Sequence, residues 1–159
     1  MEEAWDVCGV VLEVGVHLHD VVGIVVEKDE FDKKGVRIVL NFGHTAGHAI
    51  EAASRFSRQY THGEAVAIGM LVACDLAERT GHLKDKALPE RLEKTLVKFN
   101  LPVFYRGLSL ESLLSAIGYD KKSEGGTNRF VLPVSLGKTT VVRDIPGSIV
   151  TEALLKRKG

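Results

Sequence analysis

The chain has 159 residues, a length that fits one domain or the smaller part of a two-domain protein. Its 21 basic and 21 acidic residues cancel to a formal net charge of zero. This balance argues against a general nucleic-acid binder, which needs a surplus of cations facing phosphates. With 45% hydrophobic and 26% charged residues, the composition is that of an ordinary globular protein with a substantial core.

The cysteines and the N-terminus indicate a soluble, cytoplasmic protein that binds no membrane. Cys8 and Cys74 are too few and too far apart for a disulfide framework or a short-spaced metal-binding pair. Cys74 lies in an apolar run and is predicted to be a buried thiol. Glu2 and Glu3 stand where a secretory signal has basic residues, and no apolar stretch reaches the roughly 18 residues of a membrane helix.

In chain order, residues 4–26 come first and combine many valines, which favour a strand, with apolar residues at helical spacing. We predict a helix there, followed by a charged connector over residues 27–34. From Val36 to about Ser54 the pattern predicts one long helix, despite two glycines within it. A polar loop is expected over residues 57–61.

The next helix has a clear beginning and end in the sequence. Thr61 and Glu64 stand three residues apart and form a capping-box pattern. The helix is predicted to run through a nearly continuous apolar stretch to Arg79, with Gly81 ending it. A helix of this composition is expected to be central and buried on all sides.

The rest of the sequence, from residue 86 onward, predicts three further helices and one hairpin. An amphipathic helix is expected over residues 86–99 with Pro89 near its first turn, a short helix over 110–117, and a terminal helix over 148–156. Residues 129–133 and 139–142 predict the two strands of a β-hairpin. The fold class is therefore mainly α with one small β-hairpin.

A line of polar residues interrupts the apolar sequence of the predicted 36–54 helix. Arg37, Asn41, His44 and His48 stand at i, i+4, i+7 and i+11, which places them along one face of an α-helix. Burying an unpaired polar group costs roughly 1–3 kcal/mol, so such a line usually faces a cavity, a metal or a ligand. An arginine fork suits carboxylate or phosphate, and neutral imidazole suits zinc or a similar ion.

Two further features bear on this line. Gly43 and Gly47 each disfavour a helix by about 1 kcal/mol relative to alanine, which makes sense if something approaches the helix closely. Two histidines four residues apart can also be ordinary hydrogen-bonded residues, and His62 alone can be a helix-end residue. The line together with His62, at the start of the next buried helix, favours a site.

Several runs of sequence resemble the 3-dehydroquinate synthase family. The longest are Leu-Asn-Phe-Gly-His-Thr-Ala-Gly-His-Ala-Ile-Glu at 40–51 and His-Gly-Glu-Ala-Val-Ala-Ile-Gly-Met at 62–70. Shorter matches lie at 29–30, 35–37, 120–122 and 129–133. The resemblance covers roughly residues 20–145 and implies the helical C-terminal domain of the dehydroquinate synthase-like, iron-type alcohol dehydrogenase architecture. Residues 1–159 are then expected to form a single metal- and substrate-binding domain.

The resemblance also implies an activity. Enzymes of this family are lyases that convert 3-deoxy-D-arabino-heptulosonate 7-phosphate into 3-dehydroquinate with loss of phosphate, in the shikimate route to aromatic amino acids. NAD oxidises a ring hydroxyl transiently and reduces the carbonyl again later. A divalent metal, Zn²⁺ or Co²⁺, polarises the reacting oxygens.

The resemblance assigns roles to individual residues. His44 and His62 resemble the two histidine ligands of the metal, and His48 resembles the catalytic histidine that contacts substrate and helps to move protons. Arg37 and Asn41 match positions that hold the anionic groups of the substrate. One of Lys121 and Lys122, preferably Lys122, matches a lysine near the phosphate. Glu64 keeps its role as a capping residue.

Three departures from the family pattern limit the expectation. The third metal ligand of the family, a glutamate, lies farther upstream than this chain extends, and Glu2 and Glu3 are too close in sequence to replace it. No Gly-x-Gly-x-x-Gly unit is present, so the NAD-binding domain is expected to be missing. Val22 stands where the family usually has a substrate-binding lysine.

We therefore expect a C-terminal fragment or truncated homologue that binds metal weakly and NAD not at all. Its partner is then a small phosphorylated sugar acid, with association as a homodimer or with an NAD-binding half. Other sugar-phosphate cyclases and the iron-dependent alcohol or glycerol dehydrogenases are enzyme alternatives, although the anion-binding residues favour a phosphorylated substrate. A non-catalytic helical module or a gene fragment is the alternative outside catalysis.

Overall fold

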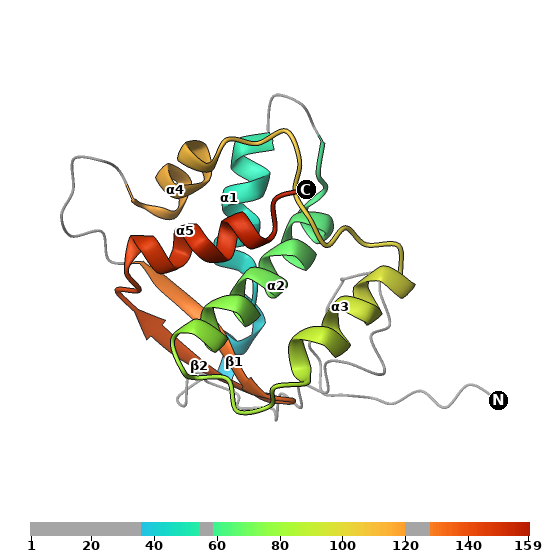
Figure 1. The fold of residues 1–159 in the computed structure, drawn as a ribbon, viewed down its shortest axis with the longest axis vertical. Coiled ribbons are helices and arrows are strands. Elements are labelled where there is room, and N and C mark those ends of the chain that lie inside the picture. The colour runs from blue at the N-terminus through green and yellow to red at the C-terminus, as the bar shows by residue number, and fades with distance from the viewer. Residues whose placement is uncertain (1–35, 55–58, 120–127) are drawn as a thin grey trace.

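The computed structural model describes residues 36–54, 59–119 and 128–159. In chain order the elements are the 3₁₀ helix Val36–Asn41, α1 (His44–Ser54), α2 (His62–Arg79), α3 (Leu88–Lys98), α4 (Leu110–Ile117), β1 (Arg129–Ser135), β2 (Lys138–Arg143) and α5 (Gly147–Lys156) (Figure 1). The predicted fold class, mainly helical with one hairpin, is confirmed. Several predictions concern residues that the structure does not describe. They are the helix over residues 4–26, the connector over 27–34, and the assignments of Val22, Lys121 and Lys122.

Helix α2 forms the centre of the fold. It packs against α1, α3, α5 and strand β1, which surround it in Figure 1. Apart from Met70, which is partly exposed, every residue from Ala65 to Ala77 is buried. The prediction of a central helix buried on all sides is confirmed for this stretch, because an apolar run on all faces of a helix requires neighbours on all sides.

Local signals set the ends of α2 as expected. The backbone N–H of Glu64 donates to Thr61 Oγ1 over 3.4 Å, and the backbone N–H of Thr61 donates to Glu64 Oε2 over 2.8 Å, which completes the capping box. The backbone N–H of Thr61, and its hydroxyl, which also donates to Glu64 Oε2 over 2.8 Å, lower the pKa of the Glu64 carboxyl. The helix ends at Arg79, with Thr80 as its C-cap.

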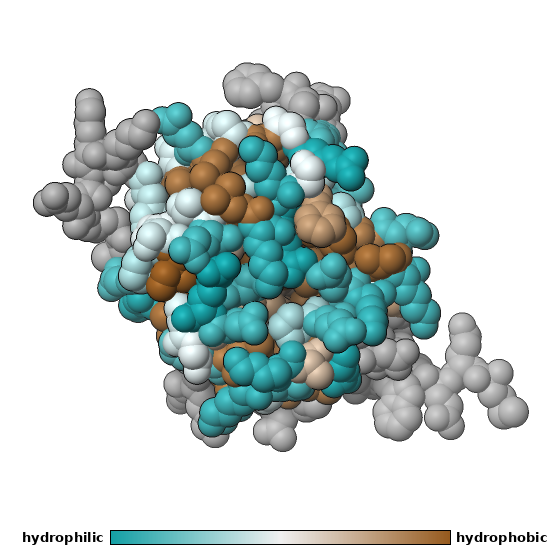
Figure 2. Space-filling model, in the orientation of Figure 1, coloured by the Kyte–Doolittle hydropathy of each residue, from teal (hydrophilic) through white to brown (hydrophobic). Residues whose placement is uncertain are grey.

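The peripheral elements also match their predicted positions. In α3, Leu88, Leu92 and Leu96 are buried on one face, as expected of an amphipathic helix, and Pro89 lies in its first turn. Strands β1 and β2 pair antiparallel, with Phe130 opposite Val142. Figure 2 shows a face of the molecule on which hydrophilic residues predominate and hydrophobic patches are small and separate.

The buried thiol is also confirmed. Cys74 is fully buried in α2, and burial, with a smaller contribution from neighbouring Asp75, raises its pKa to about 12. The thiolate is therefore a negligible fraction at neutral pH. Among the residues that the structure describes, no helix has the length and apolar content that crossing a lipid bilayer requires.

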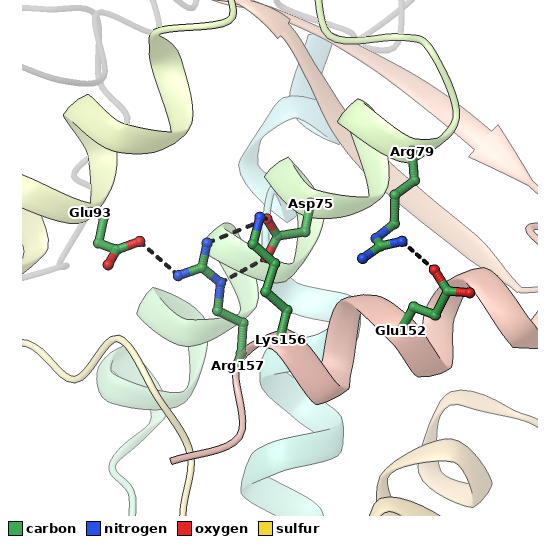
Figure 3. A network of polar contacts seen from close by, with 6 residues as sticks. All are labelled: Asp75, Arg79, Glu93, Glu152, Lys156 and Arg157. Carbon is green, nitrogen blue, oxygen red and sulfur yellow. Dashed lines mark hydrogen bonds and ion pairs between the residues drawn. The ribbon is translucent and has the colours of Figure 1, made fainter.

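A buried ionic network connects three helices around Asp75 of α2 (Figure 3). Arg157 Nε donates to Asp75 Oδ2 over 2.7 Å, and its Nη1 donates to Glu93 Oε2 of α3 over 2.7 Å. Lys156, the last residue of α5, donates to Asp75 Oδ1 over 2.5 Å. The side chains of Asp75 and Arg157 are only 1% and 5% exposed, so this pair is desolvated and its charges depend on each other.

Candidate metal and substrate site

The segment that carries the polar line is not one helix. Val36–Asn41 is a 3₁₀ helix, Phe42 and Gly43 form a turn, and α1 begins only at His44. Gly43 has a φ of +80°, a left-handed conformation that glycine adopts without strain and that interrupts an α-helix. The predicted continuous helix over 36–54 is therefore wrong.

This break also corrects the predicted alignment of four residues. His44 and His48 share a face of α1, one turn apart, but Arg37 and Asn41 precede the turn and do not continue that face. Asn41 is exposed at the end of the 3₁₀ helix. The side chain of Arg37, like Lys121 and Lys122, is outside the described part of the chain.

Glycines bring α1 and α2 unusually close together. A Cβ atom on Gly47 would lie 2.9 Å from Val66 Cα, and one on Gly43 would lie 2.6 Å from the backbone nitrogen of Met70. On the facing helix, a Cβ on Gly69 would overlap the carbonyl oxygen of Gly43. The close approach expected at Gly43 and Gly47 is thus made by helix α2.

This packing brings three imidazoles together. The ring centroids of His44 and His62 are 5.4 Å apart, those of His44 and His48 5.4 Å, and those of His48 and His62 5.5 Å. His62 is the first residue of α2, so it reaches the histidines of α1 across the helix interface. Two of these rings have a hydrogen-bond acceptor at Nδ1: the carbonyl of Phe42 at 3.3 Å for His44, and the carboxylate of Glu51 at 3.1 Å for His62.

These acceptors determine which ring nitrogen of His44 and of His62 is available to bind a metal. A carbonyl or carboxylate oxygen only accepts, so Nδ1 of His44 and of His62 carries the proton, and in the neutral form of each ring Nε2 keeps its lone pair. Burial lowers the pKa of His44, the hydrogen bond to Phe42 acts in the opposite direction, and nearby His48 and His62 lower the pKa further. His44 is therefore neutral at neutral pH, the form that binds a metal.

The spacing of the rings fits a tetrahedral metal. A zinc–nitrogen bond of about 2.0–2.1 Å puts a ring centroid about 3.2 Å from the ion, so two tetrahedral imidazole ligands have centroids roughly 5.2 Å apart. The centroids of His44 and His62 are 5.4 Å apart, close to this value, and the other two ring pairs, at 5.4 and 5.5 Å, fit it equally well. The donor set, imidazole with a nearby carboxylate, also suits zinc or cobalt.

One residue of this cluster was missed by the sequence reasoning. Glu51 lies on α1 one turn beyond His48, and one ligand atom from each of His48, Glu51 and His62 falls within 4.8 Å of the others. Its spacing, i+7 from His44 and i+3 from His48, was a usable signal, because these offsets share one helix face. Glu64, by contrast, serves the capping box as predicted.

Comparison with known proteins identifies the family. A model of the family described as 3-dehydroquinate synthase C-terminal matches residues 18–123, which include His44, His48, Glu51 and His62. The chain belongs to the 3-dehydroquinate synthase family.

Relatives within the 3-dehydroquinate synthase family are close in sequence. The 3-dehydroquinate synthase of Nitrosospira multiformis is 42% identical over 130 residues, covering 82% of this chain and 35% of that enzyme. That of Caldanaerobacter subterraneus subsp. tengcongensis is 44% identical over 132 residues, covering 83% of this chain and 35% of that enzyme. The chain thus spans about a third of the length of these curated relatives.

Solved structures of sugar-phosphate cyclases share the fold. A 2-epi-5-epi-valiolone synthase from Streptomyces hygroscopicus subsp. jinggangensis, with NAD⁺ and Zn²⁺ bound, is 27% identical with a TM-score of 0.60, over 74% of this chain and 32% of that one. A 2-deoxy-scyllo-inosose synthase complexed with carbaglucose-6-phosphate, NAD⁺ and Co²⁺ has a TM-score of 0.61 at 24% identity, over 80% of this chain and 36% of that one. The latter likeness shows the fold alone.

Proposed function

We propose that this chain forms the metal- and substrate-binding part of a 3-dehydroquinate synthase that converts 3-deoxy-D-arabino-heptulosonate 7-phosphate into 3-dehydroquinate with loss of phosphate. The observation that supports this most strongly is the triad of imidazoles 5.4–5.5 Å apart, with Nδ1 of His44 and of His62 held by acceptors. In this proposal Nε2 of His44 and of His62 bind Zn²⁺ or Co²⁺. The bound ion supplies a Lewis acid that polarises the oxygens of the reacting carbons.

Neighbouring residues are assigned proton transfer and substrate binding. His48 is exposed one turn along α1 from His44, so its ring can reach a substrate hydroxyl next to the ion and take or return its proton. Arg37 and Asn41, on the segment before the Gly43 turn, and one of Lys121 and Lys122 are proposed to hold the carboxylate and phosphate of the substrate. NAD is proposed to bind to another part of the enzyme, supplied by further sequence or by a partner chain.

A second candidate is a different sugar-phosphate cyclase activity. It is favoured by the 27% identity to 2-epi-5-epi-valiolone synthase, a cyclase named for another product. Identities above 40% to enzymes named 3-dehydroquinate synthase favour the first proposal.

Calorimetric titration tests the metal-binding part of the proposal. We expect the chain to bind one zinc ion, and His44→Ala or His62→Ala to weaken zinc binding by roughly 100-fold or more, since loss of a direct ligand should exceed the 10–100-fold typical of outer-shell residues. His82→Ala is the matched control: His82 bonds to Thr80 Oγ1 at the far end of α2 and should leave zinc affinity unchanged. Equal zinc affinity in all four proteins would exclude the assigned ligands.

The same titration, with the zinc-loaded chain, tests the substrate class. 3-Deoxy-D-arabino-heptulosonate 7-phosphate is expected to bind more tightly than carbaglucose-6-phosphate, and only when zinc is present. His48→Ala should weaken that binding without changing zinc affinity. NAD should release no heat, because the sequence has no Gly-x-Gly-x-x-Gly unit. Preference for carbaglucose-6-phosphate would favour the alternative cyclase.

A further inference from the structure

The contact between Glu51 and His62 is a side-chain bridge between α1 and α2. The Glu51 carboxylate accepts from Nδ1 of His62 over 3.1 Å, and the two side chains are 41% and 52% exposed. The rings of His44 and His48 lie beside the His62 ring, with centroids 5.4 and 5.5 Å away. The bond to Glu51 is the hydrogen bond that the described residues give this ring, and it sets which nitrogen carries the proton.

The rings of the two proposed metal ligands, His44 and His62, are oriented by different kinds of acceptor. The Nδ1 of His44 donates to the backbone carbonyl of Phe42, an acceptor fixed by the turn immediately before its own helix. His62 stands at the first position of α2 and depends on an acceptor from another helix. A carboxylate bonded to a histidine N–H fixes its tautomer, orients the ring and makes the other nitrogen a better ligand.

We propose that Glu51 is a positioning residue: its carboxylate holds His62 in the Nδ1–H tautomer, with Nε2 turned toward the cation bound by His44. This inference rests on the proposed function for the identity of the cation. In this arrangement Glu51 bonds to the Nδ1 of His62 and does not itself coordinate the cation. Direct coordination by Glu51 is the competing arrangement, because ligand atoms of His48, Glu51 and His62 lie within 4.8 Å of one another.

The first test needs no metal. Nitrogen-15 NMR of the metal-free chain at pH 8, above the ordinary histidine pKa of about 6.5, reports the tautomer of each neutral imidazole. We expect His62 to be protonated at Nδ1 in the unaltered chain and in Glu51→Gln, whose amide oxygen also accepts. Glu51→Ala should shift His62 toward the Nε2–H tautomer. A His62 tautomer that is the same in all three proteins would overturn the inference, whatever the metal results are.

The second test uses Zn²⁺ and Co²⁺ as probes. Glu51→Ala should weaken zinc binding about 10- to 100-fold, as outer-shell substitutions do, and Glu51→Gln should recover most of the loss. The Co²⁺ absorption spectrum should be the same for Glu51→Gln as for the unaltered chain. Glu90→Gln, on the exposed face of α3, is the matched control and should change none of these measurements.

The outcomes separate the two proposals. A changed Co²⁺ spectrum, with zinc binding equally weak in Glu51→Gln and Glu51→Ala, would make Glu51 a ligand and overturn its positioning role. If the unaltered chain binds neither ion but His62 shows the Glu51-dependent tautomer, the proposed function fails while the positioning of the ring stands.

Discussion

Alanine at position 69 is expected to destabilise the fold by more than about 4 kcal/mol, a large part of the roughly 5–15 kcal/mol typical of a domain. The added Cβ would overlap the carbonyl oxygen of Gly43 and lie 2.7 Å from the backbone nitrogen of Gly47. Both atoms belong to the backbone, so no side chain can rotate away and α1 must separate from α2. Urea unfolding followed by circular dichroism measures the loss.

Gly63→Ala is the matched control for this substitution. Gly63 lies in the same helix, and an added Cβ there meets no atom within 4 Å. Replacing an exposed helical glycine by alanine should leave stability unchanged or raise it by up to about 1 kcal/mol. If Gly69→Ala unfolds at the same urea concentration as the unaltered chain, the described packing of α1 on α2 is incorrect.

Asp75→Ala is expected to cost about 3–5 kcal/mol, the range measured when one partner of a buried ion pair is removed. The side chain of Arg157, only 5% exposed in the structure, would keep its bond to Glu93 but lose those to Asp75, and Lys156 would lose its contact with Asp75. The substitution removes the hydrogen bonds that Lys156 and Arg157 make to α2 through Asp75. Thermal unfolding should show a clear fall in Tm.

A surface ion pair between the same two helices provides the comparison. Arg79 of α2 and Glu152 of α5 form an ion pair whose side chains are 36% and 59% exposed (Figure 3). Glu152→Ala should therefore cost no more than about 1 kcal/mol. An equal loss from both substitutions would mean that burial does not govern the strength of the Asp75 network.

Elements with local signals were predictable from the sequence. The capping pair Thr61 and Glu64 and the apolar run behind it specify α2, because the hydrogen bonds that begin this helix join residues three apart. The buried leucines of α3 recur at four-residue spacing and identify its inner face in the same way. Such features need no knowledge of the tertiary structure.

The break at Gly43 was not predictable in this way. Gly43 and its neighbours are weak helix formers, which allows a break without locating it. The positive φ of Gly43 accompanies its contact with Met70, a residue of another helix. Tertiary packing thus broke a segment whose pattern predicts one helix. The break also separates Asn41 from the helix face that carries His44 and His48.

The candidate site was predictable in part. The resemblance to a family identified His44, His48 and His62, and the described structure brings these rings together. Glu51 was missed because its bond to His62 spans two helices, and a carboxylate on a helix is ordinarily a solvated group. The roles assigned to these residues stay predictions.

Anomalous diffraction at the zinc absorption edge, from crystals of the zinc-loaded chain, locates the bound ion relative to His44, His48, Glu51 and His62. We expect one strong peak about 2.0–2.1 Å from Nε2 of both His44 and His62, with Glu51 bonded to Nδ1 of His62. A peak bound by His48 and Glu51 without His44, or zinc bound only elsewhere on the molecule, would contradict it.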